Sequence, residues 1–215
     1  MPPKIQRAPI ASRFRGFLPI VVDVETSGLN PATDALLEMA IVPLTLDKQG
    51  MLQPLASLSY HIEPFLGAHF DPEALAVTGI DPTHPLRFAI PEQHALHLIF
   101  QKIAALLVET GCQRAVWVGH NIWFDQAFIH AAVKRSQFHK VPYHGFTTFD
   151  TATLAAVAFG ETVLAKALKA ARIPFDLSQA HSARYDAEQT AKLFCEIVNR
   201  FKPAFAQRHR SESAT

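Results

Sequence analysis

The sequence contains few cysteines, little net charge and no long hydrophobic run near its start. Cys112 and Cys195 are its only cysteines; they lie far apart and match no CxxC pattern, which excludes a disulfide scaffold and indicates a reducing compartment. A formal net charge of +1 excludes the global basic field of a purely electrostatic nucleic-acid binder. The apolar run after the first arginines is broken by Pro19 and is too short for a signal sequence or a membrane span. We therefore expect a cytoplasmic protein whose basic surfaces are local.

Length and composition predict one domain. A chain of 215 residues that is 49% hydrophobic can fill one core but not comfortably two. Residues 1–12 are rich in proline and show no periodicity, and residues 202–215 are polar with no apolar face. We expect both ends to be flexible, which leaves residues 13–201 as the folded domain.

The order of the expected elements predicts an α/β fold with a mixed sheet. Strands are expected at residues 18–25, 36–46 and 58–63, and short connections favour antiparallel pairing between them. The elements expected after these are a short helix at 72–77, a helix at 91–108, a strand at 115–119, a helix capped by His120 and Asn121 and ending near Arg135, a strand at 146–149, and helices at 151–158, 161–171 and 182–201. Three antiparallel strands followed by alternating helices and strands are typical of a sheet flanked by helices.

Two carboxylates interrupt the first strand, which reads IVVDVETSG at residues 20–28. Because successive side chains on a strand alternate faces, Asp23 and Glu25 point the same way. Like charges side by side in a partly buried site are costly or become protonated, unless a cation compensates them. A divalent metal ion is the natural candidate. The alternative is that the strand ends at Val22 and both acids lie in solvent beside a turn.

Two helices each aim one further acid at the core. On a helical wheel, Asp125 and Asp186 each share a face with a buried stripe. The stripes consist of Phe128, Ile129 and Ala132 for the first helix, and of Thr190, Leu193, Ile197 and Phe201 for the second. A core arginine could balance one such acid, whereas four inward acids match the charge of two Mg²⁺ ions. His181 precedes Asp186 by five residues, which is close enough for its side chain to lie at the same site.

The acidic segments together resemble the DEDDh class of 3′–5′ exonucleases, which have the RNase H-like fold. They read DVET at residues 23–26, HNxxFD at residues 120–125 and HxxxxD at residues 181–186. Within this class the chain is similar to the ribonuclease T family over about residues 12–201. The segments that carry this closer resemblance are RFRGFLP at 13–19, EPF at 63–65, FDTA at 149–152, AHSAxYD at 180–186 and LFCEIVNR at 193–200.

The resemblance implies a dimeric, Mg²⁺-dependent exonuclease that trims the 3′ ends of structured RNA, including tRNA and ribosomal RNA precursors. It also implies action on 3′ ends of single-stranded DNA and release of nucleoside 5′-monophosphates. By family position, Asp23, Glu25, Asp125 and Asp186 hold two Mg²⁺ ions, with Mn²⁺ as a substitute, and His181 is the general base toward water. Imidazole suits that role because its unperturbed pKa of about 6.5 leaves it largely neutral at physiological pH.

The resemblance also implies substrate-binding positions. Phe124 and Phe146 match positions that stack on the terminal bases, and Glu73 matches a residue that reads the base near the 3′ end. From the sequence alone, each phenylalanine could equally be a core aromatic. The chain departs from the family at two further stacking positions, where Leu29 and Val77 replace phenylalanines.

The family pattern implies a basic patch that is presented across the dimer to the partner's active site. Its candidates here are Arg13, Arg15, Arg114 and Lys140, although any of them taken singly is more often a solvated charge. The eleven histidines raise zinc as another metal, with pairs at His94 and His97 and at His139 and His144. No second ligand cluster stands near either pair, and the acids favour hard cations over zinc.

Two rival functions share these sequence features. A proofreading exonuclease of a DNA polymerase has the same acidic motifs, but it would co-purify with a polymerase, whereas the expected enzyme self-associates and works alone. A catalytically silent nucleic-acid-binding module on the same fold would have lost at least one of the five site residues. None of the five is missing.

Overall fold

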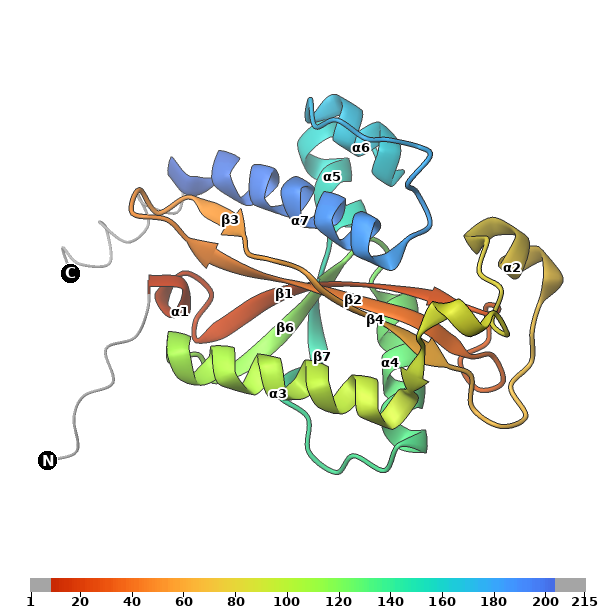
Figure 1. The fold of residues 1–215 in the computed structure, drawn as a ribbon. Coiled ribbons are helices and arrows are strands. Elements are labelled where there is room, and N and C mark those ends of the chain that lie inside the picture. The colour runs from red at the N-terminus through yellow and green to blue at the C-terminus, as the bar shows by residue number, and fades with distance from the viewer. Residues whose placement is uncertain (1–8, 204–215) are drawn as a thin grey trace, which may run out of the picture.

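The computed structural model describes residues 9–203, in which a seven-stranded sheet lies between two layers of helices (Figure 1). Helices α3 and α4 cover one face of the sheet, and α7 covers the other, with α5 and α6 packed against α7. The helices are α1 (Pro9–Arg13), α2 (Pro72–Thr78), α3 (Glu92–Thr110), α4 (Trp123–Arg135), α5 (Thr151–Phe159), α6 (Leu164–Ala170) and α7 (Ala183–Arg200), with a 3-10 turn at Pro85–Arg87. The predicted α/β class is confirmed.

The sheet has an antiparallel half and a parallel half. Its strands are β1 (Phe17–Thr26), β2 (Leu36–Leu46), β3 (Leu52–Pro54), β4 (Leu58–Glu63), β5 (Ile90–Pro91), β6 (Arg114–Gly119) and β7 (Tyr143–Asp150). They are arranged in the order β5-β4-β2-β1-β6-β7, with β3 pairing to β2. Strands β1, β2 and β4 pair antiparallel, whereas β6 lies parallel to both β1 and β7. The mixed sheet is as the sequence predicts, with β3 and β5 as additional short strands.

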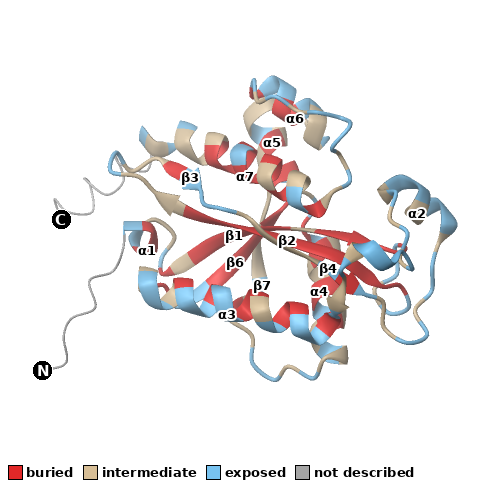
Figure 2. Ribbon diagram, in the orientation of Figure 1, coloured by how far each residue is buried: buried red, intermediate tan, exposed pale blue. Residues whose placement is uncertain are grey.

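The core lies on both faces of the central strands (Figure 2). Strand β6 and the first part of β1, up to Val22, read as apolar runs because helices cover both faces of the sheet there. Trp117, Phe128, Tyr143 and Phe194 are among the largest fully buried side chains. A smaller cluster that includes Leu168 joins α5 and α6 to α7. This packing holds the ends of β1, α4 and α7 in fixed positions relative to one another.

The predicted flexible N-terminus extends too far along the chain. Residues 9–13 form α1, and its Ile10 and Ala11 are buried against the core. Residues 1–8 and 204–215 lie outside the described residues. At the other end, Lys202 donates a hydrogen bond to the carbonyl oxygen of Gln49. The folded domain therefore begins before residue 13 and includes the first residue of the predicted C-terminal tail.

Two further predictions about helices are wrong. Helix α4 is not capped by His120 or Asn121: it begins after Ile122, with no side-chain cap. Asn121 instead has a left-handed backbone with φ of 59°, and its N–H donates to Asp150 Oδ1 at 2.8 Å. Phe201 does not belong to the buried stripe of α7, because it lies just past the end of the helix and is half exposed.

The apolar stretch Thr151–Ala170 has the length and composition of a membrane span. In the structure it is divided into two helices, because Gly160 ends α5 with a left-handed φ of 73° and α6 begins only at Leu164. Leu168 is fully buried where α6 packs against α7. The stretch therefore forms part of the helical layer over the sheet.

Candidate active site

Four acids from three elements meet near the end of β1. Asp23 and Glu25 leave one face of β1, and Asp186 lies in the first turn of α7. Oxygen atoms of these three carboxylates all lie within 4.8 Å of one another. Asp125, in the first turn of α4, is buried and accepts a hydrogen bond from the backbone N–H of Val24 at 3.0 Å. The alternative of a strand that ends at Val22 is wrong, since β1 continues to Thr26.

The backbone of His181 orients Asp186. Its N–H donates to Asp186 Oδ2 at 2.9 Å, from a residue with a left-handed φ of 66°. The other carboxylate oxygen, Oδ1, is buried and has no hydrogen-bond partner. The imidazole of His181 itself is exposed, just before α7 begins. One oxygen of Asp186 is thus held in place while the other is left for a ligand.

Burial raises the pKa of every acid in this group, and repulsion from neighbouring acids adds to it at Asp23 and Glu25. Burial is the largest cause for Asp23, whose pKa lies well above its ordinary value, with further contributions from Asp125, Glu25 and Asp186. The pKa of Glu25 rises to about 8 through burial and the charges of Asp186 and Glu38. Burial also raises the pKa of Asp125 to about 8, against two backbone hydrogen bonds that lower it. Full ionisation of the group at neutral pH therefore requires positive charge from outside the chain.

A fifth acid, Glu38, lies beside the group and was not among the acids predicted from the sequence. It stands directly opposite Glu25 in the β1–β2 pair, is buried, and its pKa is raised by burial. Its Oε2 accepts a hydrogen bond from the backbone N–H of Ala183 at 3.4 Å, at the start of α7. Glu38 interrupts an apolar strand as Asp23 does, so the same signal could have found it.

These residues fit divalent cations. Carboxylate oxygens are the ligands that Mg²⁺ prefers, and a buried acceptor without a donor, such as Asp186 Oδ1, is the kind of atom that a cation satisfies. Within residues 9–203, Asp23, Glu25 and Asp186 are the one group of three or more acids, histidines or cysteines with this spacing. The paired histidines of the zinc alternative are not part of it.

Without metal ions, we expect the stability of the protein to fall as the pH rises from 5 to 8. The pKa of Glu25 is raised from an ordinary 4.5 to about 8, so over this interval the folded state holds a proton that the unfolded chain has released. The free energy of unfolding decreases with pH wherever the folded state binds more protons. The melting temperature in a chelator should therefore be lower at pH 8 than at pH 5, and Mg²⁺ should raise it more at pH 8. A chelated protein that is more stable at pH 8 would contradict the raised pKa values.

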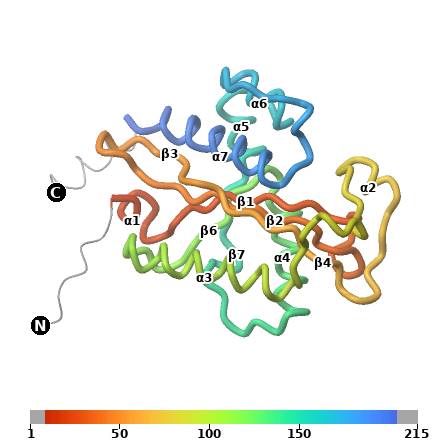
Figure 3. The backbone as a smooth tube through the Cα atoms, in the orientation of Figure 1, coloured from red at the N-terminus to blue at the C-terminus, as the bar shows by residue number. Residues whose placement is uncertain are grey.

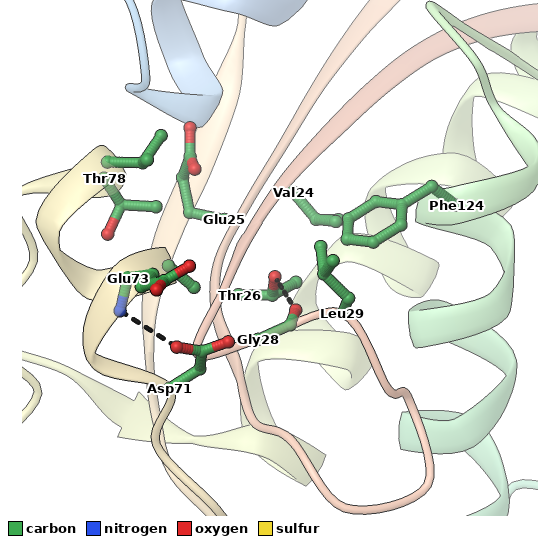
Figure 4. Close-up of a pocket in the computed structure, with 11 residues that line it drawn as sticks. Val24, Glu25, Thr26, Gly28, Leu29, Asp71, Glu73, Thr78 and Phe124 are labelled. Atoms are coloured by element: carbon green, nitrogen blue, oxygen red, sulfur yellow. Dashed lines mark hydrogen bonds between the residues drawn. The ribbon is translucent and has the colours of Figure 1, made fainter.

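A cavity of about 330 Å³ opens beside the acids, between α2 and α4 (Figure 4). Its walls are Val24, Glu25, Thr26, Gly28, Leu29, Asp71, Glu73, Ala74, Val77, Thr78 and Phe124. Figure 4 shows Glu25 turned toward the start of α7, away from Leu29 and Phe124. The cavity is mostly apolar and has a carboxylate of the acid group at one end. This arrangement suits a flat apolar group with a phosphate next to it, which a bound cation would neutralise.

The end of β1 holds α2 in place, although α2 has no fully buried residue of its own. Ser27 Oγ donates to the carbonyl oxygen of His69 at 2.6 Å, and the N–H of Asp71 donates to the carbonyl oxygen of Ser27 at 2.7 Å. Gly28 is required at this point, because a Cβ there would lie 2.1 Å from Asp34 Oδ2. These contacts set the position of α2 relative to the acids.

Four of the five predicted base-contacting residues lie around this cavity. Leu29, Glu73, Val77 and Phe124 all line it, and Leu29 and Val77 are 76% and 58% exposed. Phe124 is half-buried and its ring packs 5.0 Å from that of the core residue Phe128, so it faces both the core and the cavity. Phe146 is 90% exposed on β7 and is not a core aromatic.

The predicted basic patch lies far from the acids within one chain. Arg114 stands opposite Phe17 at the start of β1, and Asp23 is six residues further along the strand, a distance of about 20 Å at 3.3 Å per residue. Arg13 and Arg15 lie in and just after α1, at the end of the molecule opposite α2 (Figure 3). The structure therefore does not bring the basic residues to the acids of the same chain.

Comparisons with known proteins place the chain in an exonuclease family. A family model described as an exonuclease matches residues 20–194. Ribonuclease T of Yersinia enterocolitica is 55% identical over 193 residues, which cover 90% of each chain, and ribonuclease T of Citrobacter koseri is 53% identical over 197 residues, which cover 92% of each. Among solved structures, exonuclease I of E. coli in complex with a dT13 oligonucleotide is similar in fold, with a TM-score of 0.68 at 19% identity. That match covers 89% of this chain and 43% of the longer exonuclease I chain.

Proposed function

The chain belongs to the exonuclease family that includes ribonuclease T, and we propose that it trims the 3′ ends of structured RNAs. As a member of this family it is a 3′–5′ exonuclease that acts on RNA and on single-stranded DNA. Its products would be nucleoside 5′-monophosphates, and its substrates tRNA ends and precursors of tRNA and ribosomal RNA. The observation that carries the proposal is the cavity that ends at the acid group. A cavity of about 330 Å³ has the size of a small-ligand site and suits the unpaired end of a strand. We also expect the enzyme in the cytoplasm, as the scarcity of cysteine indicates.

In this proposal Asp23, Glu25, Asp125 and Asp186 hold two Mg²⁺ ions. When bound, the ions would supply an activated water and stabilise the leaving 3′ oxygen. The imidazole of His181 accepts the proton of the attacking water, while its backbone N–H keeps Asp186 in position. The proposal is supported by the open acceptor Asp186 Oδ1 and by the raised pKa values of the acids, which a bound cation would lower.

To test the proposal, the pure protein is incubated with tRNA that carries an internal label and an intact CCA end. With Mg²⁺ we expect stepwise shortening from the 3′ end and release of nucleoside 5′-monophosphates, and no reaction in a chelator. Purification without a partner also separates the proposal from the polymerase proofreading alternative. Activity that requires an added polymerase subunit, or cleavage inside the chain, would overturn the proposal.

We expect the active enzyme to be a homodimer, with Arg13, Arg15, Arg114 and Lys140 of one subunit near the acids of the other. The separation of about 20 Å along β1 between Arg114 and Asp23 supports this arrangement, since Arg114 does not contact the acids of its own chain. Affinity for RNA should then fall steeply with salt, because contacts to phosphate release counterions. Arg114→Ala is expected to reduce this salt dependence and to leave the hydrolysis of a dinucleotide unchanged. A fully active monomer in sedimentation at micromolar concentration would refute the dimer.

Restoring the family's aromatic residues at Leu29 and Val77 should tighten binding of the 3′ end. Both side chains line the cavity and are more than half exposed, so phenylalanine can be accommodated at either position. Base stacking on an aromatic ring is worth about 1 to 3 kcal/mol, of which a branched aliphatic residue recovers a part. We expect the double variant Leu29→Phe, Val77→Phe to bind a short single strand several-fold more tightly and to discriminate more between 3′-terminal bases.

The control for this experiment is Val157→Phe, which changes a 75% exposed valine on α5 outside the cavity. It should alter neither affinity nor base preference. If the double variant also changes neither, and Phe124→Ala is equally harmless, the 3′ end is not held by stacking.

A further inference from the structure

The two tryptophans of the chain have opposite environments. Trp117 is 0% exposed in the middle of β6, whereas Trp123 is 69% exposed at the first position of α4. Packing in the core therefore explains the first tryptophan and not the second. Trp123 directly precedes Phe124, the aromatic wall of the cavity. A large indole is thus kept in water at the rim of the substrate site.

The two rings at this rim are in contact. The centroids of Trp123 and Phe124 are 5.9 Å apart, with the rings at 89° to each other, which is a favoured edge-to-face geometry. Phe124 is itself packed against the buried Phe128. Trp123 is therefore supported from one side by rigid aromatic neighbours, while most of its surface stays open.

The face of α4 that carries Trp123 contacts β7 one residue before a second exposed aromatic residue. Residues three apart on a helix are neighbours on its surface, so Gln126 shares a face of α4 with Trp123. Gln126 Nε2 donates to the carbonyl oxygen of Gly145 at 3.3 Å, which places this face beside Phe146, exposed at 90% on β7. Phe124, Trp123 and Phe146 thus extend from the cavity outward over α4 and β7.

We propose that Trp123 stacks on a base of the single-stranded segment of the substrate, just outside the cavity that takes the 3′-terminal end. This rests on the proposed action on RNA 3′ ends. A flat, exposed, well-supported ring binds any base, because every base has a π-face. The role is needed in this chain, because the cavity itself presents the aliphatic Leu29 and Val77. Trp123 then holds the strand while Phe124 contacts the terminal end.

Tryptophan fluorescence tests this inference directly, because Trp117 is buried and only Trp123 can be reached by a ligand. The experiment uses full-length protein carrying Asp23→Asn, which prevents turnover, and a short single-stranded oligoadenylate with six nucleotides. We expect saturable quenching of the fluorescence as the oligonucleotide is added. The quenching should be lost in Trp123→Phe, which keeps an aromatic ring and should bind the oligonucleotide within about threefold of the Trp123 protein.

Binding affinity provides the second readout. In fluorescence anisotropy with a labelled oligonucleotide, Trp123→Ala should raise Kd at least about fivefold, the lower bound for one lost base–aromatic stack. The same variant should bind adenosine 5′-monophosphate as well as its parent, because a mononucleotide does not reach beyond the cavity. Phe201→Ala is the matched control, since Phe201 is a half-exposed aromatic residue at the far end of α7, and it should leave both values unchanged.

Three outcomes would overturn the inference. An unchanged Kd in Trp123→Ala would mean that the indole does not contact the strand. An equal loss of mononucleotide binding would place Trp123 inside the cavity or show damage to α4. Fluorescence that changes with protein concentration and not with oligonucleotide would place Trp123 in an interface between copies of the chain. Trimming of tRNA by the wild-type protein, measured in parallel, separates these failures from a failure of the proposed function.

Discussion

Asp23→Asn is expected to reduce hydrolysis of 3′ ends to less than a few per cent of the wild-type rate in Mg²⁺ and to leave the fold intact. Asp23 belongs to the group of three carboxylates whose oxygens lie within 4.8 Å of one another. Asparagine keeps the shape of the side chain but removes the charge that a divalent cation requires. The rate is measured with labelled single-stranded RNA at saturating Mg²⁺, and the fold by circular dichroism.

The same variant should unfold no more easily than the wild type when metal is removed. The pKa of Asp23 is raised by burial and by the charges of Asp125, Glu25 and Asp186, so its ionised form destabilises the metal-free protein. In a chelator at pH 8, Asp23→Asn should therefore melt at an equal or higher temperature, and Mg²⁺ should raise its melting temperature less than that of the wild type.

Glu109→Gln provides the control for charge, because Glu109 is exposed on α3 away from the site. It should change neither the rate nor the effect of Mg²⁺. If Asp23→Asn keeps more than a few per cent of the activity, the assignment of two metal ions to these acids is wrong. If it instead loses its secondary structure, the acid group is needed for folding and the rate carries no information on catalysis.

His181→Ala is expected to lower turnover by about 10²- to 10⁴-fold, the usual contribution of a positioned general base. Metal binding and substrate affinity should be largely preserved. The reason is structural: the contact of His181 with Asp186 is made by its backbone N–H, which the substitution keeps. Turnover is measured in single-turnover experiments, and metal binding by the rise in melting temperature with added Mg²⁺.

His181→Asn serves as a second variant, because the left-handed backbone of residue 181, with φ of 66°, is tolerated better by asparagine than by alanine. Equal losses of turnover in both variants would assign the effect to the missing imidazole. If turnover is low in His181→Ala but normal in His181→Asn, the effect would be assigned to the backbone that orients Asp186. If either variant loses its affinity for Mg²⁺, His181 acts as a ligand and not as the base.

The elements and the candidate acids could be predicted from sequence because their signals are local. Alternation along a strand places Asp23 and Glu25 on one face, and helical periodicity directs Asp125 and Asp186 inward. The order of the elements was enough to predict a mixed sheet. Local signals failed at boundaries, as for α1, where the burial of Ile10 depends on contacts with distant strands.

Contacts between distant residues decided the rest. Glu38 lies opposite Glu25 because of the register between β1 and β2. The hydrogen bond from the N–H of Val24 to Asp125 joins residues 101 positions apart in the sequence. Neither can be read from periodicity. The same holds for the position of the basic residues near α1, which lie at the other end of β1 from the acids.

The sequence by itself determined the α/β class, the longer strands and helices, and four of the five acids, because each depends on repeats of two to four residues along one element. Only the tertiary structure decided how the acids meet, that one oxygen of Asp186 stays without a donor, and that Trp123 faces water beside the cavity while Trp117 is buried. The physical reason is that burial, pKa and cavity shape depend on which surfaces pack together. That packing is set by pairings between segments far apart in the chain.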